Sequence, residues 1–373
     1  MKISCITYHG AYNYGSVLQT FATVQYFRQL GFDIEIINYT PSHLRHHGSF
    51  FTTYHEISLR HYTPPLRIFL SLIKIFSYQK QLDVFWHFLQ KYIPLTKPYP
   101  SIESLKKSPP QADLYCTGSD QVWNNYFTEK FDSAYFLDFL PEQAKKISFS
   151  ASFGKENFDQ AELKFIQKKL KKYRYLSVRE NSALRILSEI GYQGDKILDP
   201  TLLLEADAWK KLSKKRKVKG AYLLVYQLHA DSKALDMALA FKKMTGIPVI
   251  RIATMYHQRA KSSRKKVLPE VENFLGYFRY AAYIFTDSFH GVAFSLQFNR
   301  NFYVTLPSKF SDRILTILQE VNLSNRILDD PEDLRKIPAK ISYQKVNRLL
   351  QKSREESKAS FNRGLKDLHC GSF

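Results

Sequence analysis

Two Rossmann-like α/β domains are expected from this sequence. Short apolar, β-branched runs alternate with segments whose apolar residues recur at helical spacing, and the alternation occurs in two series separated by a lysine-rich stretch. The 373 residues are enough for two domains of about 100–200 residues each. We therefore predict an N-terminal domain over residues 1–205, a C-terminal domain over 220–335 and a helical tail over 336–373.

The composition is that of a globular protein with a strong positive charge. Hydrophobic residues make up 44% of the chain, and 55 lysines and arginines against 34 acidic residues give a formal charge of +21. These values exclude a disordered, collagen-like or low-complexity chain. The three cysteines, Cys5, Cys116 and Cys370, are far apart and form no CxxC motif, so we expect neither a disulfide framework nor a zinc site. This cysteine usage predicts a cytoplasmic protein.

The chain opens with a strand, a helix and a second strand. Residues 2–8 are an apolar, β-branched run, residues 17–30 have helical periodicity, and Gly31 stands where a helix-terminating glycine is expected. Residues 33–39 (DIEIINY) then form the next strand. Such a unit requires parallel strands joined by a right-handed crossover.

A helical insertion is predicted over about residues 45–110, which are rich in histidine, aromatic residues and proline. Within residues 66–78 the apolar positions recur at helical spacing, namely at Ile68, Leu72, Ile75 and Phe76. Such a helix either packs on the core or lies on a membrane, and we expect it to pack on the core. No run approaches the roughly 20 apolar residues that span a bilayer.

The first domain continues with strands that end in polar residues. The predicted strands are 112–117, 146–152 and 175–178, and the helices that follow them are 162–173 and 181–190. Gly118-Ser119-Asp120, Phe153-Gly154 and Arg179-Glu180 follow these strands directly. Because ligands bind at the carboxyl edge of open parallel sheets, this recurrence predicts a binding site at that edge.

The second series repeats the pattern and carries most of the positive charge. Its elements are strands 221–227, 248–252, 283–287 and 301–306, helices 232–244, 274–280, 291–297 and 312–321, and a terminal helix 343–369. Residues 201–373 hold 31 basic and 16 acidic residues, including clusters at 210–219 and 261–266. These clusters are either solvated loops or attract polyanions such as anionic lipids or phosphorylated substrates. We expect no nucleic-acid partner, since no aromatic RNA-binding pattern, metal finger or helix-turn-helix is present.

Candidate functional residues lie where predicted strands end. The loop with Asn13, Gly15 and Ser16 precedes a helix whose amide groups can hold a phosphate or a sugar, although a glycine there can equally serve only the turn. Arg179 can bind a carboxylate or phosphate bidentately, or pair with a neighbouring carboxylate. His290 stands at a strand-to-helix junction, where a titratable side chain faces the cleft.

Six motifs carry a family resemblance. AYNYGSVLQTFA, CTGSDQVWN, SFSASFG, SVRE, LDPTLLL and TDSFHGVAFSLQFNRNF occur in this order over about residues 1–330, and with them the chain resembles the polysaccharide pyruvyl transferase family. The resemblance implies a GT-B-like arrangement of the two domains with the active site in the interdomain cleft. It also implies transfer of pyruvate from phosphoenolpyruvate to two hydroxyls of a sugar, as a ketal, in the biosynthesis of an exopolysaccharide or capsule.

The resemblance assigns the donor side of the site. Arg179 and His290 correspond to phosphoenolpyruvate-site residues, and a basic residue expected about twenty positions later is matched by Lys309. Because a histidine titrates near neutral pH, we expect His290 to bind the phosphate and to act as the catalytic acid or base. Many members have a basic residue before the aromatic-histidine pair, whereas this chain has Ser288. We therefore place Ser288 with Arg179 and Lys309 in donor binding, and either Lys309 or Arg313 replaces the missing cation.

An orienting carboxylate and the acceptor side complete the predicted site. We expect Asp287 to orient His290. The acceptor is expected to contact Asn13, Gly15, Ser119, Asp120 and Trp123, although Asp120 can instead cap a helix and Trp123 can lie in the core.

No metal and no cofactor are expected besides phosphoenolpyruvate as co-substrate. The expected acceptor is a sugar or lipid-linked oligosaccharide, with peripheral contact to an anionic membrane at its cytoplasmic face. The alternative enzyme is a GT-B-type nucleotide-sugar glycosyltransferase, because the same cleft and the same residue types suit a diphosphate. A polyanion-binding scaffold without catalysis is the non-enzyme alternative.

Overall fold

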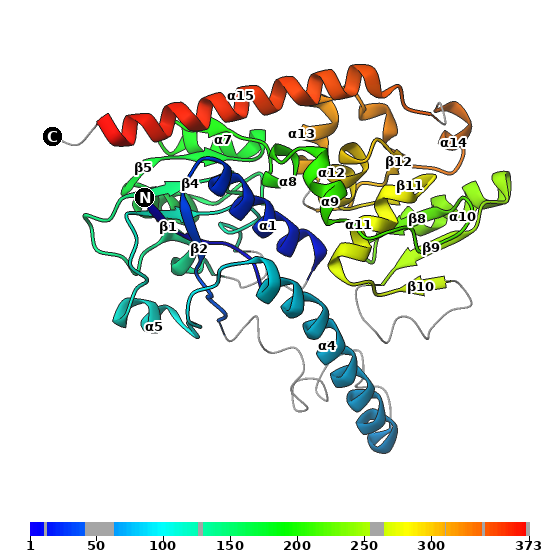
Figure 1. Ribbon diagram of the computed structural model, residues 1–373, viewed down its shortest axis with the longest axis horizontal. Coiled ribbons are helices and arrows are strands. Elements are labelled where there is room, and N and C mark those ends of the chain that lie inside the picture. Colours follow the sequence, from blue (N-terminus) through cyan, green and yellow to red (C-terminus); the bar gives the residue numbers. More distant parts are fainter. Residues whose placement is uncertain are drawn as a thin grey trace.

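Two parallel sheets form the framework of the computed structural model (Figure 1), which describes residues 1–10, 13–41, 63–125, 130–253, 265–309, 311–337 and 340–370. The first sheet has the order β2-β1-β3-β4-β5 and the second the order β10-β9-β8-β11-β12. All their strand pairs are parallel. The architecture is therefore α/β, as predicted, with a Rossmann-like unit around each sheet.

The first unit holds the elements up to residue 212. Its strands are β1 (Lys2–Ile6), β2 (Asp33–Ile36), β3 (Leu114–Thr117), β4 (Lys146–Ser148), β5 (Tyr173–Tyr175) and the small pair β6 (Ser177–Val178) and β7 (Asp195–Lys196). Its helices are α1 (Tyr14–Gln29), α4 (Pro64–Tyr92), α5 (Ile102–Lys107), the 3-10 helix η2 (Ser133–Phe136), α6 (Gln160–Leu170), α7 (Asn181–Glu189), α8 (Pro200–Leu203) and α9 (Ala206–Leu212). The predicted strands and main helices recur here with ends shifted by a few residues.

The second unit follows the lysine-rich stretch. Its strands are β8 (Leu223–Tyr226), β9 (Val249–Ile252), β10 (Lys265–Val267), β11 (Tyr283–Thr286) and β12 (Asn301–Val304). Its helices are α10 (Ala234–Thr245), α11 (Val271–Tyr280), α12 (Phe289–Gln297), α13 (Asp312–Glu320), the 3-10 helix η4 (Ser324–Arg326) and α14 (Asp333–Lys336). Of the predicted basic cluster at 261–266, residues 261–264 lie outside the described residues.

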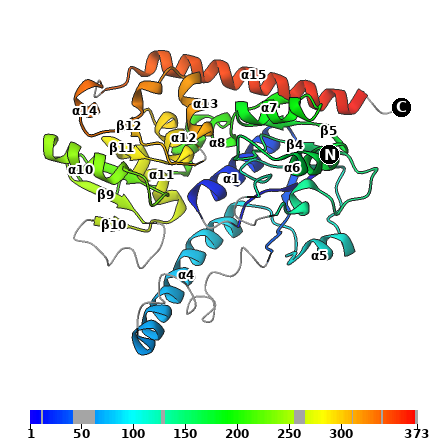
Figure 2. The ribbon, with the colours of Figure 1, turned by 180° about the vertical axis from the view of Figure 1, so that it is seen from behind.

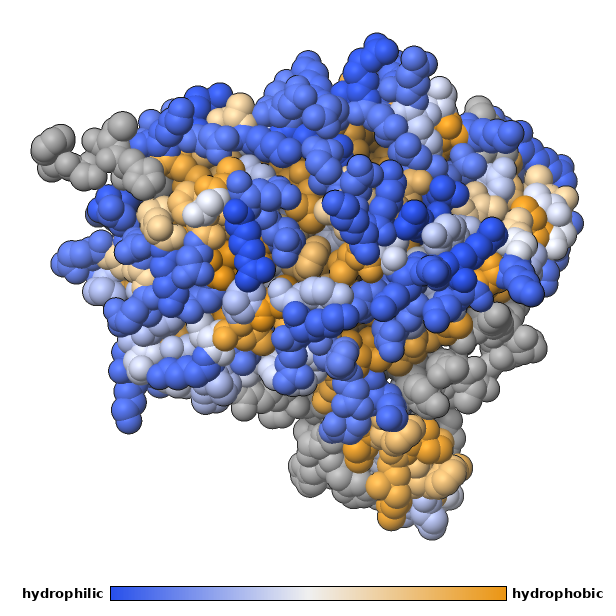
Figure 3. Space-filling model, in the orientation of Figure 1, coloured by the Kyte–Doolittle hydropathy of each residue, from blue (hydrophilic) through white to orange (hydrophobic). Residues whose placement is uncertain are grey.

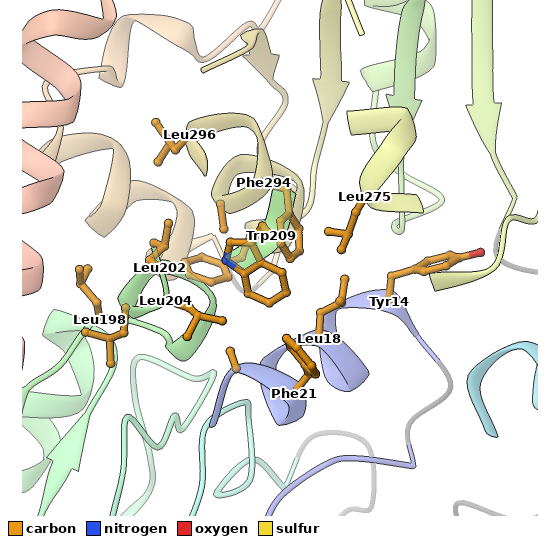
Figure 4. Close-up of a cluster of buried hydrophobic side chains, with 14 of the residues drawn as sticks. Tyr14, Leu18, Phe21, Leu198, Leu202, Leu204, Trp209, Leu275, Phe294 and Leu296 are labelled. Carbon is orange, nitrogen blue, oxygen red and sulfur yellow. The ribbon is translucent and has the colours of Figure 1, made fainter. Parts of the chain in front are cut away.

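An apolar interface joins the two units. Tyr14 at the start of α1 stacks on Phe274 of α11 with ring centroids 4.2 Å apart, and its hydroxyl donates to the carbonyl of Pro269 at 2.6 Å. Trp209 of α9 packs edge-on against Phe294 of α12, and Figure 4 shows these rings meeting the α1 side chains. Because this core is continuous across both units, α1 and α12 have a fixed relative position.

The terminal helix α15 (Tyr343–Cys370) lies across both units, as Figures 1 and 2 show from opposite sides. Phe361 packs on Phe149 of the first unit, and Arg354 Nε donates to the carbonyl of Leu202 at 2.6 Å. At its other end Tyr343 donates to the carbonyl of Arg300 in the second unit. The predicted terminal helix therefore also ties the two units together.

Helix α4 departs from the prediction that it packs on the core. Its second half does so through Phe85, Phe88 and Leu89, which are buried. In its first half, however, the apolar side chains are exposed, including Ile68, Leu72 and Phe76. The helical spacing of the apolar residues predicted the helix correctly but did not indicate which face of the helix is buried. Residues 42–62 of the predicted insertion lie outside the described residues, and no described helix is apolar and long enough to cross a membrane.

Candidate functional site

The carboxyl ends of strands from both units converge on one cluster of buried charged side chains. Asp120 follows β3, Arg179 and Glu180 follow β6, and Asp199 follows β7 at the start of α8. His290 lies in the first turn of α12, directly after β11. The site therefore forms where the two sheets face each other, at the edge where open parallel sheets bind ligands.

Arg179 lies at the centre of this cluster. Its side chain is 2% exposed, and Nη1 donates to Asp199 Oδ2 at 2.5 Å. Nη2 lies 3.7 Å from Asp120 Oδ1 and Nε lies 3.8 Å from Glu180 Oε2, and the guanidinium carbon lies 5.0 Å from the ring centroid of Phe289. Within the described part of the chain, Nε and Nη2 have no hydrogen-bond acceptor.

Asp199 fixes Arg179 and is itself held by the start of α8. Its Oδ1 accepts from the backbone N–H of Thr201 at 2.9 Å and from the Thr201 hydroxyl at 2.6 Å. Its Oδ2 accepts from the Ser119 hydroxyl at 3.2 Å. Burial raises the pKa of Asp199, but the Arg179 charge and these hydrogen bonds outweigh it and lower the pKa overall. Asp199 is therefore an ionised, fully buried carboxylate.

His290 lies between Asp199 and the first turn of α1. Its Nε2 is 3.9 Å from Asp199 Oδ2 and has no hydrogen-bond partner in the described residues. Gly15 approaches the other side of the ring so closely that a Cβ built on it would lie 2.1 Å from His290 Nδ1. Burial lowers the pKa of His290 below 6.5, against the attraction of Asp199 and Asp120. The imidazole is therefore neutral at neutral pH.

A second arginine, Arg313, enters the cluster from the first turn of α13. Its side chain is 13% exposed, Nη1 lies 3.8 Å from Asp120 Oδ1, and the guanidinium carbon lies 6.0 Å from the Phe289 ring centroid. Its Nε has no hydrogen-bond acceptor among the described residues. Burial and the neighbouring charge of Arg179 lower the pKa of Arg313 to about 10, so it stays cationic at neutral pH.

A cavity of about 320 Å³ opens beside these arginines, between loops of both units. The first unit lines it after β4 and at the start of α7, and the second unit lines it between β12 and α13. The lining residues are Gly154, Lys155, Glu156, Asn157, Glu180, Ser182, Ser308, Lys309, Ser311, Asp312 and Arg313. Ser182 joins the two walls by donating to Asp312 Oδ2 at 2.6 Å. The cavity thus combines three cationic and three acidic side chains with the N-terminal ends of two helices, and helix N-termini favour an anion.

The predicted donor residues take three different places. Arg179 and His290 lie in the cluster, whereas Lys309 is an exposed residue of the cavity wall. Ser288 is buried and caps α12 by accepting from the Gly291 N–H at 3.4 Å. Of the two cations proposed to replace the missing basic residue, Arg313 belongs to the cluster, with Nη1 3.8 Å from Asp120 Oδ1.

Among the predicted acceptor residues, Gly15 and Asp120 belong to the cluster. Asp120 has a left-handed backbone (φ 75°) and accepts from the Ser16 hydroxyl at 3.2 Å, so it links α1 to the arginines and does not cap a helix. Asn13 caps α1 by accepting from the Ser16 N–H at 2.8 Å. Ser119 is fully buried and supports Asp199, so it does not face the cavity.

Two of the sequence-based interpretations are wrong. Trp123 is fully buried, stacks on Phe136 and donates its Nε1–H to the carbonyl of Tyr135 at 3.2 Å, so it cannot offer a ring face to a sugar. Asp287 accepts from the backbone N–H groups of Leu228 and His229 at 2.8 Å each, which directs it toward the loop after β8. The carboxylate nearest to His290 is Asp199.

Sequence reasoning missed the roles of Asp199 and Glu180. Asp199 precedes Pro200-Thr201, a pattern that predicts only a helix N-cap. Glu180 is predicted only as a partner of its neighbour Arg179. Glu180 Oε1 accepts from Ser152 and from two backbone N–H groups, while burial raises the pKa of Glu180 despite the neighbouring arginines. Only the tertiary structure brings these carboxylates to Arg179 and His290.

Comparisons with known proteins give a family and a fold. The sequence model of the polysaccharide pyruvyl transferase family matches residues 13–308. No curated protein sequence matches the chain. Among solved structures, an alpha-glucosyltransferase in complex with UDP and a 13-mer DNA is 7% identical, with a TM-score of 0.50 over 98% of each chain.

Two further solved structures resemble the chain. A UDP-forming α,α-trehalose-phosphate synthase from Burkholderia xenovorans is 9% identical, with a TM-score of 0.49 over 98% of each chain. A UDP-GlcNAc 2-epimerase from Methanocaldococcus jannaschii is 14% identical, with a TM-score of 0.47 over 94% of this chain and 99% of that chain. The likeness to the alpha-glucosyltransferase concerns the fold, two Rossmann-like units in a GT-B-like arrangement.

Proposed function

The chain belongs to the polysaccharide pyruvyl transferase family, and we propose that it transfers the pyruvyl group of phosphoenolpyruvate to two hydroxyls of a sugar in cell-surface polysaccharide biosynthesis. The observation that carries the proposal is a set of buried donors and acceptors without partners in the described residues. Arg179, Arg313 and His290 all have such nitrogen atoms, and all three belong to the cluster around Asp120 and Asp199, from which Arg313 also reaches the wall of the interdomain cavity. Buried polar groups normally have partners, so unpartnered ones in one cluster favour a polar ligand there.

The donor is proposed to bind through the arginines and the cavity lysines. Phosphoenolpyruvate carries about three negative charges, and a planar guanidinium binds a carboxylate or phosphate with two parallel hydrogen bonds. Arg179 pairs with Asp199, and Arg313, whose Nη1 lies 3.8 Å from Asp120, is proposed as the second cation for the donor. Lys155 lines the cavity from the first unit, where it also pairs with Glu162 at 3.0 Å, and Lys309 lines it from the second unit. Ser288 contributes by capping α12, which orients His290.

His290 is proposed to move the proton in ketal formation. A sugar hydroxyl adds to C2 of phosphoenolpyruvate while the methylene carbon takes up a proton, and the second hydroxyl then closes the ring as the bond from C2 to the phosphate oxygen breaks. One hydroxyl proton thereby ends on the new methyl group and the other on the released phosphate. Neutral His290 is ready to accept the first proton, and general acid–base catalysis of this kind contributes about 10²–10⁴-fold. Asp199 stabilises the imidazolium that forms.

The acceptor is proposed to lie toward the first unit, beside Asn13, Gly15 and Asp120. Asp120 connects this edge to Arg179 and Arg313, so a sugar held there is close to the donor. A lipid-linked oligosaccharide is the proposed acceptor, which makes peripheral contact with the cytoplasmic face of an anionic membrane part of the proposal. No resident cofactor is part of the proposed mechanism.

The test is phosphate release from phosphoenolpyruvate in the presence of galactose-, mannose- and glucose-containing acceptors. We expect acceptor-dependent release that falls by at least about 10²-fold in His290→Ala. His229→Ala is the matched control, because His229 faces Asp287 on the neighbouring loop and takes no part in the cluster. Turnover in His290→Ala close to that of the unaltered protein would remove the proposed role of His290.

The nucleotide-sugar glycosyltransferase alternative is supported by the fold of the solved alpha-glucosyltransferase alone. Calorimetric titration with phosphoenolpyruvate and with UDP-sugars distinguishes the two donors. Heat with a UDP-sugar and none with phosphoenolpyruvate would replace the proposal by that alternative.

A further inference from the structure

The first half of α4 exposes an apolar face that the proposed reaction does not use. Of the ten large apolar side chains that are exposed in the described part of the chain, seven lie on this helix. Four of them, Phe69, Leu72, Ile73 and Phe76, follow the i, i+3, i+4, i+7 spacing that places side chains on one side of a helix. Phe69 is 59% exposed, and Leu66 and Ile68 continue the face toward the start of the helix. We call Leu66, Ile68, Phe69, Leu72, Ile73 and Phe76 the α4 face.

The polarity of the first half of α4 is reversed relative to a helix that packs on a water-soluble core. Its buried side includes Ser71, Ser77 and Gln81, while the α4 face is turned outward. Figures 1 and 2 show this half of α4 projecting from the body, and Figure 3 shows its end as an apolar surface. Exposed contiguous apolar patches mark surfaces that bind a membrane or another protein.

The charges near the α4 face favour a lipid surface. Arg67, Lys74 and Lys80 lie on the first five turns of the helix, and no acidic residue occurs in residues 64–82. Lys80 Nζ lies 5.6 Å from the ring centroid of Phe76, so a cation borders the apolar face directly. Apolar side chains flanked by lysine and arginine are the pattern of helices that lie in the interface of an anionic bilayer.

A second copy of the chain is the less suitable occupant. Association of two α4 faces would bring the same cations together without acidic partners on residues 64–82, and each chain carries a formal charge of +21. An anionic lipid surface instead presents negative charge to these cations. The length and positive charge of α4 suit a helix that lies in the plane of a bilayer. Its apolar stretch is not long and apolar enough to cross a bilayer.

We propose that the α4 face inserts into the interfacial region of an anionic lipid bilayer, with Arg67, Lys74 and Lys80 contacting the lipid headgroups. The inference deepens the proposed function, since it names the surface for the membrane contact included there. Vesicle binding requires no turnover, however, so it is measured independently of the proposed reaction.

The experiment is flotation of the full chain with phosphatidylcholine vesicles that contain or lack about 30% phosphatidylglycerol. We expect binding to the anionic vesicles that weakens by at least about tenfold in F69Q/L72Q/F76Q. The matched control is L228Q/M244Q, which removes two exposed apolar side chains from the second unit and should bind unchanged. A third variant, R67Q/K74Q/K80Q, should lose the preference for the anionic vesicles.

Folding and self-association are checked on the same samples. Because the three altered apolar residues are exposed, F69Q/L72Q/F76Q should keep the melting temperature of the unaltered protein. Absence of vesicle binding by the unaltered protein, or equal binding by F69Q/L72Q/F76Q, would overturn the proposal. A dimer in lipid-free solution that this variant abolishes would also overturn it and would assign the α4 face to a second copy of the chain.

Discussion

Replacing Gly15 by alanine tests whether contact between the two units positions His290. The new Cβ would lie 2.1 Å from His290 Nδ1 and 2.7 Å from its Cε1 and Cγ, whereas ordinary contacts begin near 3.4 Å. The ring or the first turn of α1 must therefore shift by about 1.3 Å. A displacement of about 1 Å at reacting groups lowers the rate by about 10²-fold, and overpacking of a buried site costs about 1–3 kcal/mol of stability.

The assay is kcat/KM for phosphate release from phosphoenolpyruvate, together with thermal unfolding of the same samples. Gly10→Ala is the matched control, because its Cβ would meet Thr40 Cγ2 at 3.7 Å, an ordinary contact. We expect Gly10→Ala to be within about threefold of the unaltered protein, since it places no new atom against His290. Activity of Gly15→Ala equal to that of the unaltered protein, or an equal loss in both variants, would refute the reasoning.

Three further predictions concern the buried charges. Asp199→Asn should lower kcat and move the acidic limb of the kcat/KM profile to lower pH, because Asp199 raises the pKa of His290. Measurements of kcat/KM against pH check this, and an acidic limb at unchanged pH would contradict it. Arg179→Ala should reduce the free energy of unfolding by about 3–5 kcal/mol, since it leaves Asp199 buried without its cation. Arg313→Ala should reduce the free energy of unfolding less, because the guanidinium of Arg313 lies 3.8 Å from Asp120. Equal losses for the two variants in urea titrations would argue against these pairings. Burial lowers the pKa of both His9 and His290, so the unfolded state takes up these protons first as the pH falls below about 6.5. Stability measured by thermal unfolding should then decrease on acidification by up to about 1.4 kcal/mol per pH unit for each histidine, and a constant stability from pH 7.5 to 5.5 would be inconsistent with this.

The sheets and the edge that carries the site follow from local sequence patterns. Apolar runs such as residues 283–287 that are separated by helices favour parallel strands with right-handed crossovers. The polar residues at the carboxyl ends of such strands then lie at the same edge of the sheet. Arg179 and His290 could be selected in this way because each directly follows a strand. Predicting these two residues therefore did not require the contacts between the two units.

The remaining parts of the site depend on contacts between distant segments. Asp199 follows the two-residue strand β7, which has too little periodicity to be recognised, and its partner Arg179 is reached only through the fold. Trp123 was assigned to the acceptor because a tryptophan beside polar residues suits a sugar, but it fills the core behind them. The spacing of Leu72 and Phe76 predicted a helix with an apolar face without indicating that this face turns outward.

The balance of buried charges constrains how a donor with about three negative charges can bind. Asp120, Asp199 and Glu180 surround Arg179, and Arg313 adds a second cation, so the cluster contains three acidic side chains against two basic ones. The donor must therefore be compensated by other groups. For the proposed donor, the cavity lysines are one source of positive charge, and protonation of Glu180, whose pKa is raised by burial, would remove one negative charge. In the proposed reaction His290 must be neutral when it accepts the first hydroxyl proton, and the imidazolium formed in that step is then the acid that protonates the methylene carbon. The lowered pKa that burial gives His290 is therefore what its proposed role as a base requires.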